Sequence, residues 1–221
     1  MTIQQVVDLA RNSELKNLAV KDDISAIVGY INLGMLELYK RFPLEVKEHM
    51  IELVEGTDIY TMPSDFMWMV AAYDEVPEDE FVNTISVPIN EEDNPLSINT
   101  VSWNKVQVPV EVNGAYISVI YVAAPPVFMY DSETKIYSYV DSDGVTQSGA
   151  DLGLPLPAQM TEPLLHFIGY RAHGAVSGEI NGENRAHYMN FEASCNRIEQ
   201  RGMFTSDDVN MDYRYENRIW V

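Results

Sequence analysis

The sequence predicts an α+β fold, in which helices from both ends of the chain form a bundle and an antiparallel β-rich region of hairpins is inserted between them. Residues 22–42 carry apolar side chains at a period near 3.6, and residues 157–202 carry two more such stripes, separated by the Gly-rich break SGEINGEN. From residue 48 the pattern changes to alternation of apolar and polar residues, which is typical of strands. We therefore expect a helical body (residues 1–47 and 157–202), an inserted β-rich region (residues 48–156) and a C-terminal extended tail (residues 203–221).

Two helices are expected before Pro43. Thr2 is a suitable N-cap for a short opening helix that ends near Asn12. Asp22 and Asp23 suit the start of the main N-terminal helix, because the helix dipole stabilises acids there. The inward-facing residues would be Ile3, Val6, Val7 and Ala10 in the first helix and Ile24, Ile27, Val28, Ile31, Met35 and Leu38 in the second.

The first half of the inserted region should contain a hairpin and a strand. Residues 49–63 alternate around Glu55-Gly56-Thr57-Asp58, which favours a β-hairpin with a short turn. Residues 67–73 form an apolar run of strand length, in which we expect Trp68 to lie in the core. Residues 77–99 are rich in Glu, Asp, Asn and Pro, so they should form a loop with fragmentary strands.

A second hairpin is predicted around Asn113-Gly114, which separates VQVPVEV from AYISVIYV. The Asn-Gly pair accepts positive φ at both central positions, as a type I′ turn requires. Pro109 lies inside the first of these strands, so that strand should be at a sheet edge or carry a bulge.

Residues 127–155 are expected to form a projecting hairpin with a tight turn at Asp141-Ser142-Asp143-Gly144 and a mobile tip. Its tyrosines would either pack the hairpin on the body or form a contact surface for a neighbouring protein. The candidate residues for a tail-side or inter-subunit contact are Tyr130, Tyr137, Tyr139, Asp141 and Asp143.

The stretch from residue 157 to 202 should fold as an αα-hairpin. The apolar faces are Leu164, Leu165, Ile168, Ala172 and Ala175 in its first helix and Tyr188, Phe191, Cys195 and Ile198 in its second. Two helices with one apolar stripe each cannot close a core alone. The main N-terminal helix is the expected third partner.

The last residues, MFTSDDVNMDYRYENRIWV, carry no helical period but contain several aromatic side chains. Disordered tails are poor in aromatics, whereas Tyr, Trp and Arg dominate protein interfaces. We expect this tail to contact a partner subunit or another protein, in preference to docking on its own subunit. The candidate contact residues are Phe204, Tyr213, Arg214, Tyr215, Arg218, Ile219 and Trp220.

Composition excludes several classes of function. No run approaches the roughly 18 apolar residues of a membrane span, and the N-terminus lacks a signal-peptide pattern, so we expect synthesis in the cytoplasm and no membrane partner. The net charge is −20, without a visible basic patch, which disfavours a sequence-reading DNA-binding domain. A wall along which DNA slides without sticking is compatible with that charge.

The sequence points to no catalytic, cofactor or metal site. Glu162 and His166, and likewise Glu183 and His187, stand four apart, but the di-iron and zinc-protease spacings are missing, so isolated surface pairs are the preferred interpretation. Asp141-Ser142-Asp143-Gly144 lacks the distal ligands of a calcium loop and is interpreted as a turn. Cys195, the single cysteine, is expected to be a buried hydrophobe.

Three pieces of the sequence resemble the head-to-tail connector, or adaptor, proteins of tailed bacteriophages, which bind under the portal. The first is the helix ending in ELYKRFP, and the second is DIYTMPSDFMWMV, similar to a Tyr-x-Leu-Pro-x-Asp-Phe segment with Met62 in place of Leu. The third is IYVAAPP, followed by LPAQMTEPLLHFIGYRAHGAVSGE and a final helix. The likeness covers most of residues 20–202, while residues 77–99 and 127–155 look like departures from it.

The resemblance implies a structural virion protein without enzyme activity or cofactor. It would form a dodecameric ring in the neck of the virion, extend the DNA channel below the portal protein and provide the platform for tail or nozzle proteins. Because C-terminal extensions in that family reach the portal, the resemblance assigns the portal contact to residues 204–221.

An alternative is a phage tail-associated protein that binds or hydrolyses glycans. Hydrolysis would need a pair of carboxylates, and 34 acidic residues supply many pairs without indicating one. Binding would need exposed stacking platforms, for which Trp103 and Trp220 are the open candidates.

Overall fold

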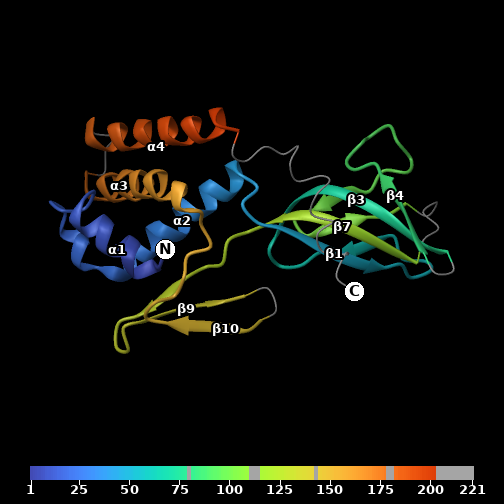
Figure 1. Ribbon diagram of the computed structural model, residues 1–221, viewed down its shortest axis with the longest axis horizontal. Coiled ribbons are helices and arrows are strands. Elements are labelled where there is room, and N and C mark those ends of the chain that lie inside the picture. The colour runs from blue at the N-terminus through green and yellow to red at the C-terminus, as the bar shows by residue number, and fades with distance from the viewer. Residues whose placement is uncertain (79–80, 110–114, 142–143, 178–181, 203–221) are drawn as a thin grey trace. The chain divides into compact units, whose positions relative to one another are not determined.

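The computed structural model describes residues 1–78, 81–109, 115–141, 144–177 and 182–202, and it confirms the α+β class with antiparallel sheets (Figure 1). The described residues form two compact units. The helical unit comprises Met1–Phe42 and the described residues from Pro125 onward, and the sheet unit comprises Pro43–Ala124. The chain thus leaves the helical unit once and returns to it after the sheet unit is complete.

The first helix, α1 (Ile3–Asn12), begins as the sequence predicts. The Thr2 side chain accepts a hydrogen bond from the Gln5 backbone, and the Gln5 side chain accepts one from the Thr2 backbone, which makes a capping box. The four predicted inward residues are all buried. A short 3-10 helix, η1 (Ala19–Asp22), leads to the next helix.

The second helix, α2 (Ile24–Arg41), is capped by Asp23, whose carboxylate accepts a hydrogen bond from the Ala26 backbone at 3.0 Å. The predicted stripe is buried except at Ile24, which is half-buried in the first turn. Phe42 takes an extended conformation ahead of Pro43, because the residue before a proline avoids the helical region.

Helix α3 (Thr161–Ser177) follows the short 3-10 helix η2 (Ala158–Met160) and contacts α1, α2 and α4 (Gly182–Gln200). In Figure 1, α4 runs alongside α3. Gly34 permits the close packing of α2 on α3, because a Cβ atom there would lie 2.6 Å from Leu164 Cδ1. The C-terminal end of α2 is held to α4 by Arg41, which donates hydrogen bonds to Glu192, Asn196 and Glu199.

Residues 127–155 contain a three-stranded antiparallel sheet instead of a simple hairpin. Its order is β10 (Thr146–Gly149), β9 (Ile136–Val140), β8 (Met129–Asp131). The Asn32 amide on α2 both donates to and accepts from the Phe128 backbone, at 2.8 and 2.9 Å. Tyr137 on β9 is buried and donates to Gln4 Oε1 at 2.7 Å. These contacts hold the small sheet within the helical unit.

The sheet unit contains two antiparallel sheets around one core. The larger has the order β1 (Val46–Glu52), β7 (Tyr116–Ala123), β3 (Phe66–Glu78), β4 (Phe81–Val87), and the smaller has the order β2 (Ile59–Thr61), β6 (Lys105–Gln107), β5 (Asn99–Ser102). The core between them includes Ile51, Met62, Phe66, Met69, Ile98, Val106, Ile117, Val119 and Tyr121.

Both predicted hairpins of this region are wrong in their pairing. Strands β1 and β2 lie in different sheets, where β1 pairs with β7 and β2 pairs with β6. Strands β6 and β7, on either side of Asn113-Gly114, are also in different sheets, because β7 has β1 on one edge and β3 on the other. The turn residues 113–114 lie outside the described residues. Alternation indicates a strand, but it does not say which strand will occupy its edges.

Two further expectations in this unit are corrected. Part of the predicted loop at residues 77–99 is strand β4, which pairs along β3. Trp68 is 36% exposed instead of lying in the core. Register shifts occur in β3 on both sides of it, between Phe66 and Trp68 and between Met69 and Ala71. Such bulges redirect side chains out of the strict alternation.

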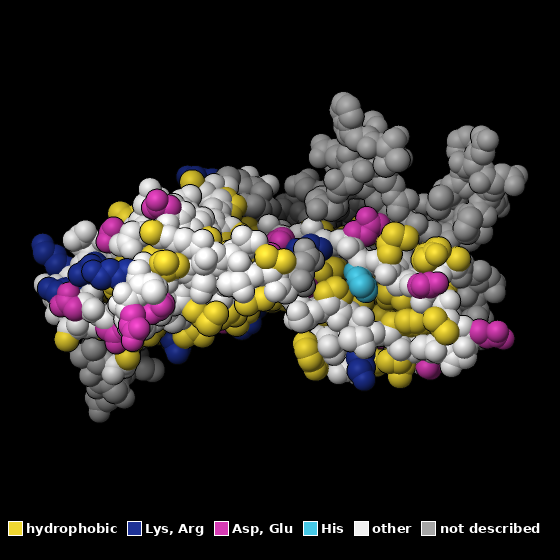
Figure 2. Space-filling view, turned by 90° about the horizontal axis from the view of Figure 1, so that it is seen from below, with side chains coloured by type: hydrophobic (Ala, Val, Ile, Leu, Met, Phe, Trp, Pro, Cys, Tyr) yellow, Lys and Arg dark blue, Asp and Glu magenta, His cyan; other side chains and the backbone are white. Residues whose placement is uncertain are grey.

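Within the described residues, none of the helices has the length and apolarity needed to cross a bilayer. Figure 2 shows one face of the molecule, on which basic side chains lie in small groups beside acidic and apolar ones. The face that is shown carries no continuous basic patch of the kind that binds nucleic acid.

Candidate functional site

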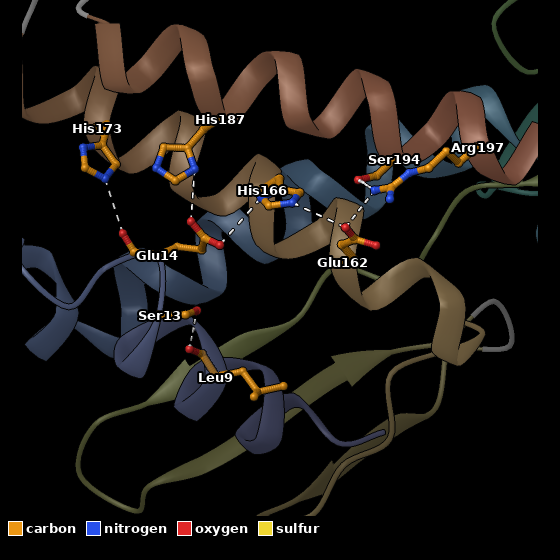
Figure 3. A network of polar contacts seen from close by, with 9 residues as sticks. All are labelled: Leu9, Ser13, Glu14, Glu162, His166, His173, His187, Ser194 and Arg197. Carbon is orange, nitrogen blue, oxygen red and sulfur yellow. Dashed lines mark hydrogen bonds and ion pairs between the residues drawn. The ribbon is translucent and has the colours of Figure 1, made fainter.

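Three of the four histidines gather around one glutamate in the helical unit (Figure 3). Glu14 comes from the turn after α1, His166 and His173 from α3, and His187 from α4. The side chains of Glu14, His166 and His187 are 18–20% exposed, so the cluster is mostly removed from water.

The turn that holds Glu14 is fixed on both sides. Ser13 ends α1 and donates its hydroxyl to the Leu9 carbonyl at 2.7 Å. Leu15 is fully buried, and its backbone donates to the Ala10 carbonyl at 2.9 Å. Because its two neighbours are anchored, Glu14 is held with its carboxylate toward α3 and α4 (Figure 3).

The Glu14 carboxylate lies between two imidazole rings. Its Oε2 is 3.0 Å from Nδ1 of His187, and its Oε1 is 3.6 Å from Nδ1 of His166. Both Nδ1 atoms are buried and make no hydrogen bond of ordinary geometry. The pKa of Glu14 is held below its usual range, chiefly by the short polar contact with His187, while burial acts in the opposite direction.

The remaining members of the cluster surround this centre. His173 stacks on His187 with ring centroids 4.8 Å apart, and its own Nδ1 is 3.2 Å from Glu183. Nε2 of His166 is 3.8 Å from Glu162, a carboxylate that accepts a hydrogen bond from Arg197 at 2.8 Å. The polar network therefore runs from α4 across α3 to the turn after α1.

Glycines on α3 make room for these contacts with α4. A Cβ atom on Gly169 would lie 2.7 Å from Nδ1 of His187, which is closer than a real Cβ atom comes to a neighbouring atom. One and a half turns later, Gly174 allows Asn184 to approach and donate to the Tyr170 carbonyl at 2.7 Å. Gly169 thus allows the His187 ring to pack directly against the backbone of α3.

The site was only partly visible in the sequence. Interpreting Glu162 with His166 and Glu183 with His187 as isolated surface pairs is wrong in two respects: Glu183 contacts His173, and both His166 and His187 face Glu14. Glu14 itself was missed. It is about 150 to 170 residues away from its partners in the chain, and no local pattern marks it.

A groove of about 550 Å³ opens beside the cluster. Glu14, Glu162 and His166 line it together with Arg197, which donates hydrogen bonds to Glu162 on α3 and to Ser194 on its own helix. Its other lining residues are Leu9, Ala158, Gln159, Thr161, Leu165, Ile198 and Arg201. The groove therefore brings solvent to the edge of the cluster at Glu14 and His166, while the two Nδ1 atoms stay buried.

Among the residues expected at an intermolecular contact, the described ones make contacts within the chain. The rings of Tyr130 and Tyr137 pack at 5.1 Å, and Tyr139 packs edge-on against Phe128 at 5.1 Å. Asp141 accepts hydrogen bonds from the Val145 backbone and the Gln147 side chain, so it forms part of a turn. Asp143 and the whole predicted portal contact (Phe204, Tyr213, Arg214, Tyr215, Arg218, Ile219 and Trp220) lie outside the described residues.

Cys195 on α4 is fully buried, in agreement with its expected place on an apolar helix face. Burial raises the pKa of the thiol to about 11, while the charge of Arg41 acts in the opposite direction. A thiol with a raised pKa is a poor nucleophile at neutral pH.

Comparison with known proteins identifies one family. The sequence model of the family described as "SU10 adaptor protein" matches residues 1–212, which includes all of the described residues of both units. No curated protein sequence matches the chain.

Proposed function

The chain belongs to the SU10 adaptor protein family, and from this premise we propose that it forms a ring below the phage portal, extends the DNA channel and carries the tail. The family is one of bacteriophage structural adaptor proteins of the head–tail region and is not known for an enzyme activity. The match over nearly the whole chain is the observation that carries the proposal.

A closed ring of identical subunits requires a heterologous interface, in which one surface of each subunit meets a different surface of the next. We propose twelve subunits, with the portal protein above the ring and tail or nozzle proteins below it. The chain's net charge of −20 suits a channel wall, because phosphates are repelled by acidic side chains and would be retained by basic ones.

The proposed portal contact consists of the tail residues Phe204, Tyr213, Arg214, Tyr215, Arg218, Ile219 and Trp220. On the tail side, Tyr130 and Tyr139 are half-buried and leave part of their surface available to a neighbour. Tyr137 is 1% exposed and would act in such a contact only by supporting the ring of Tyr130.

Electron microscopy of the chain purified with its cognate portal tests the proposal. We expect a ring coaxial with the portal, and we expect a chain ending at Gly202 to keep its helical circular dichroism but to lose the complex. The matched control is Asp93→Asn, an exposed change outside the proposed contacts. Absence of the protein from virions, or a monomer bound to no portal, would refute the proposal.

One observation favours the glycan-binding alternative: Trp103, in the turn between β5 and β6, is 69% exposed. An exposed indole can stack on a sugar ring. Glycan-dependent quenching of tryptophan emission that disappears in Trp103→Leu and persists in Trp68→Leu would support this alternative. The adaptor proposal expects no quenching in any of these proteins.

A further inference from the structure

We propose that Glu14, His166 and His187 form a binding site for a divalent transition-metal ion of the Zn²⁺ class. One ligand atom from each residue lies within 4.8 Å of the others. The three ligands come from three separate segments, the turn after α1, α3 and α4, so a bound ion would join them. Such an ion would stabilise the part of the helical unit that the chain assembles from both of its ends.

The separations between ligand atoms match those around a common ion. Zinc binds imidazole nitrogen and carboxylate oxygen at about 2.0–2.2 Å, so two ligands at a tetrahedral angle are about 3.4 Å apart. The two distances from the Glu14 oxygens to the Nδ1 atoms of His187 and His166, 3.0 and 3.6 Å, bracket that value. The ligand atoms of the three residues lie within 4.8 Å of one another, so an ion would draw them together around a centre that they already face.

A bound metal ion would provide a partner for two buried ring nitrogens. Nδ1 of His166 and Nδ1 of His187 are both buried without a hydrogen bond, although both face the same carboxylate. Buried polar atoms are normally paired, so two such atoms at one point indicate a missing partner. A cation between them would accept both lone pairs and neutralise Glu14.

The surroundings have the features of a supported ligand site. Ligating histidines commonly direct their second ring nitrogen to a carboxylate, which fixes the tautomer. Nε2 of His166 faces Glu162 at 3.8 Å, and Arg197 holds that carboxylate in place. Gly169 provides the space for the His187 ring, which any larger residue would fill.

The donor set selects the class of ion. Two imidazoles and one carboxylate suit Zn²⁺, Co²⁺ or Ni²⁺, whereas Mg²⁺ and Ca²⁺ prefer oxygen ligands alone. The groove at Glu14 and His166 leaves room for a water molecule as the fourth ligand.

The test uses the full chain, stripped with chelator and titrated with Zn²⁺ at neutral pH by calorimetry. We expect one equivalent to bind and the midpoint of thermal unfolding to rise with Zn²⁺ concentration, while Mg²⁺ has no effect. Glu14→Gln, His166→Gln and His187→Gln should each weaken binding by about 100-fold or more, because loss of a supporting residue alone typically costs about 10- to 100-fold. His49→Gln, in the sheet unit, is the matched control and should bind as the wild type does.

A second measurement uses only the wild type, so its result does not depend on whether the variants fold. In the ¹⁵N spectrum of the histidine rings, Zn²⁺ should shift Nδ1 of two histidines and leave His49 unchanged. Binding that survives in all three ligand variants would show scattered acidic sites and overturn the proposal. So would a wild type whose ring nitrogens and unfolding midpoint respond to pH and not to Zn²⁺, since the cluster would then hold protons instead of a metal.

Discussion

At the scale of single residues, Asn32 shows how one side chain can replace a missing backbone partner. Its amide pairs in both directions with the Phe128 backbone, next to the start of β8. Asn32→Asp keeps the shape but turns the donor into an acceptor against the Phe128 carbonyl. We expect the free energy of unfolding to fall by about 2–3 kcal/mol.

Urea denaturation at neutral pH measures this loss. The control is Asn17→Asp, which adds the same charge at an exposed position and should change the stability by less than about 0.5 kcal/mol. Equal effects of the two variants would mean that added charge, and not the pair with Phe128, causes the loss.

Cys195 gives a second residue-scale prediction. Its pKa of about 11 leaves about 100-fold less thiolate at neutral pH than an ordinary thiol has, and its side chain is buried. A water-soluble disulfide reagent should therefore react with the native chain far more slowly than with the chain in urea. Native and denatured rates within a factor of about three would contradict the buried position.

Single residues were predictable where their partners are close in the chain. The N-caps Thr2 and Asp23 were identified because the backbone groups they satisfy lie three residues away. Glu14 was not, because the rings that face it come from α3 and α4 and are brought there only by tertiary packing. The candidate site thus depends on contacts that a sequence period does not encode.

At the scale of elements, two glycines of α2 predict opposite outcomes for the same substitution. A Cβ on Gly34 would meet Leu164 and Phe167 of α3, at 2.6 and 3.1 Å, whereas one on Gly29 would meet nothing within 4 Å. Gly34→Ala should lower the free energy of unfolding by about 1–3 kcal/mol through overpacking. Gly29→Ala should raise it by about 0.5–1 kcal/mol through helix propensity.

Chemical denaturation of both variants gives the sign of each change. Because the substitution is identical and lies in the same helix, the two variants control for each other. A stabilising Gly34→Ala would show that α3 can move away from α2 at little cost.

The link between the ends of α2 and α4 predicts a dependence on pH. Arg41 donates hydrogen bonds to Glu192 and Glu199, and this contact is the largest cause of the lowered pKa of Glu199. A carboxylate with a lowered pKa in the folded state stabilises the fold above its unfolded-state pKa, and that stabilisation is lost as the pH falls through the folded-state pKa. Arg41→Met should cost about 1–2 kcal/mol at neutral pH, a modest value because both carboxylates are partly exposed.

Thermal unfolding between neutral and acid pH tests this expectation. Lys40→Met removes the same charge from the same turn, but it breaks only an exposed pair with Glu37 and should be nearly neutral. The difference between the two variants should shrink as the pH falls from neutral through the lowered folded-state pKa of Glu199, where its carboxylate takes up a proton. A difference that does not change with pH would attribute the role of Arg41 to packing alone.

The type of each element was predicted better than the pairing of the strands. The stripe of α2 and the alternation of residues 49–63 each indicated the correct type of structure. The pairings failed because strands that are neighbours in sequence entered different sheets, and the occupant of a sheet edge is decided by the whole unit. Trp68 is exposed although it lies in an apolar run, and the register shifts of β3 flank it.

At the scale of the whole molecule, the segment that forms the sheet unit is inserted in the sequence between the two segments that form the helical unit. The helical unit is built from Met1–Phe42 and from the described residues from Pro125 onward, so its core takes side chains from both parts of the chain. The proposed metal site has the same requirement, since Glu14 and its two histidines come from opposite ends. The helical periods of residues 22–42 and 157–202 predicted helices in both of these parts of the chain.

The charge of the molecule makes a prediction about assembly. Each subunit carries a net charge of −20, so neighbours in the proposed ring repel one another. Raising the salt concentration from about 0.1 to 1 M shortens the screening length from about 10 to about 3 Å and weakens this repulsion. Analytical ultracentrifugation of the chain, alone and with portal, should therefore show more ring at high salt.

Sucrose at equal osmolality is the control, because it does not screen charge, and an equal response to it would exclude screening as the cause. Rings that dissociate as salt rises would show instead that ion pairs between subunits dominate the interface.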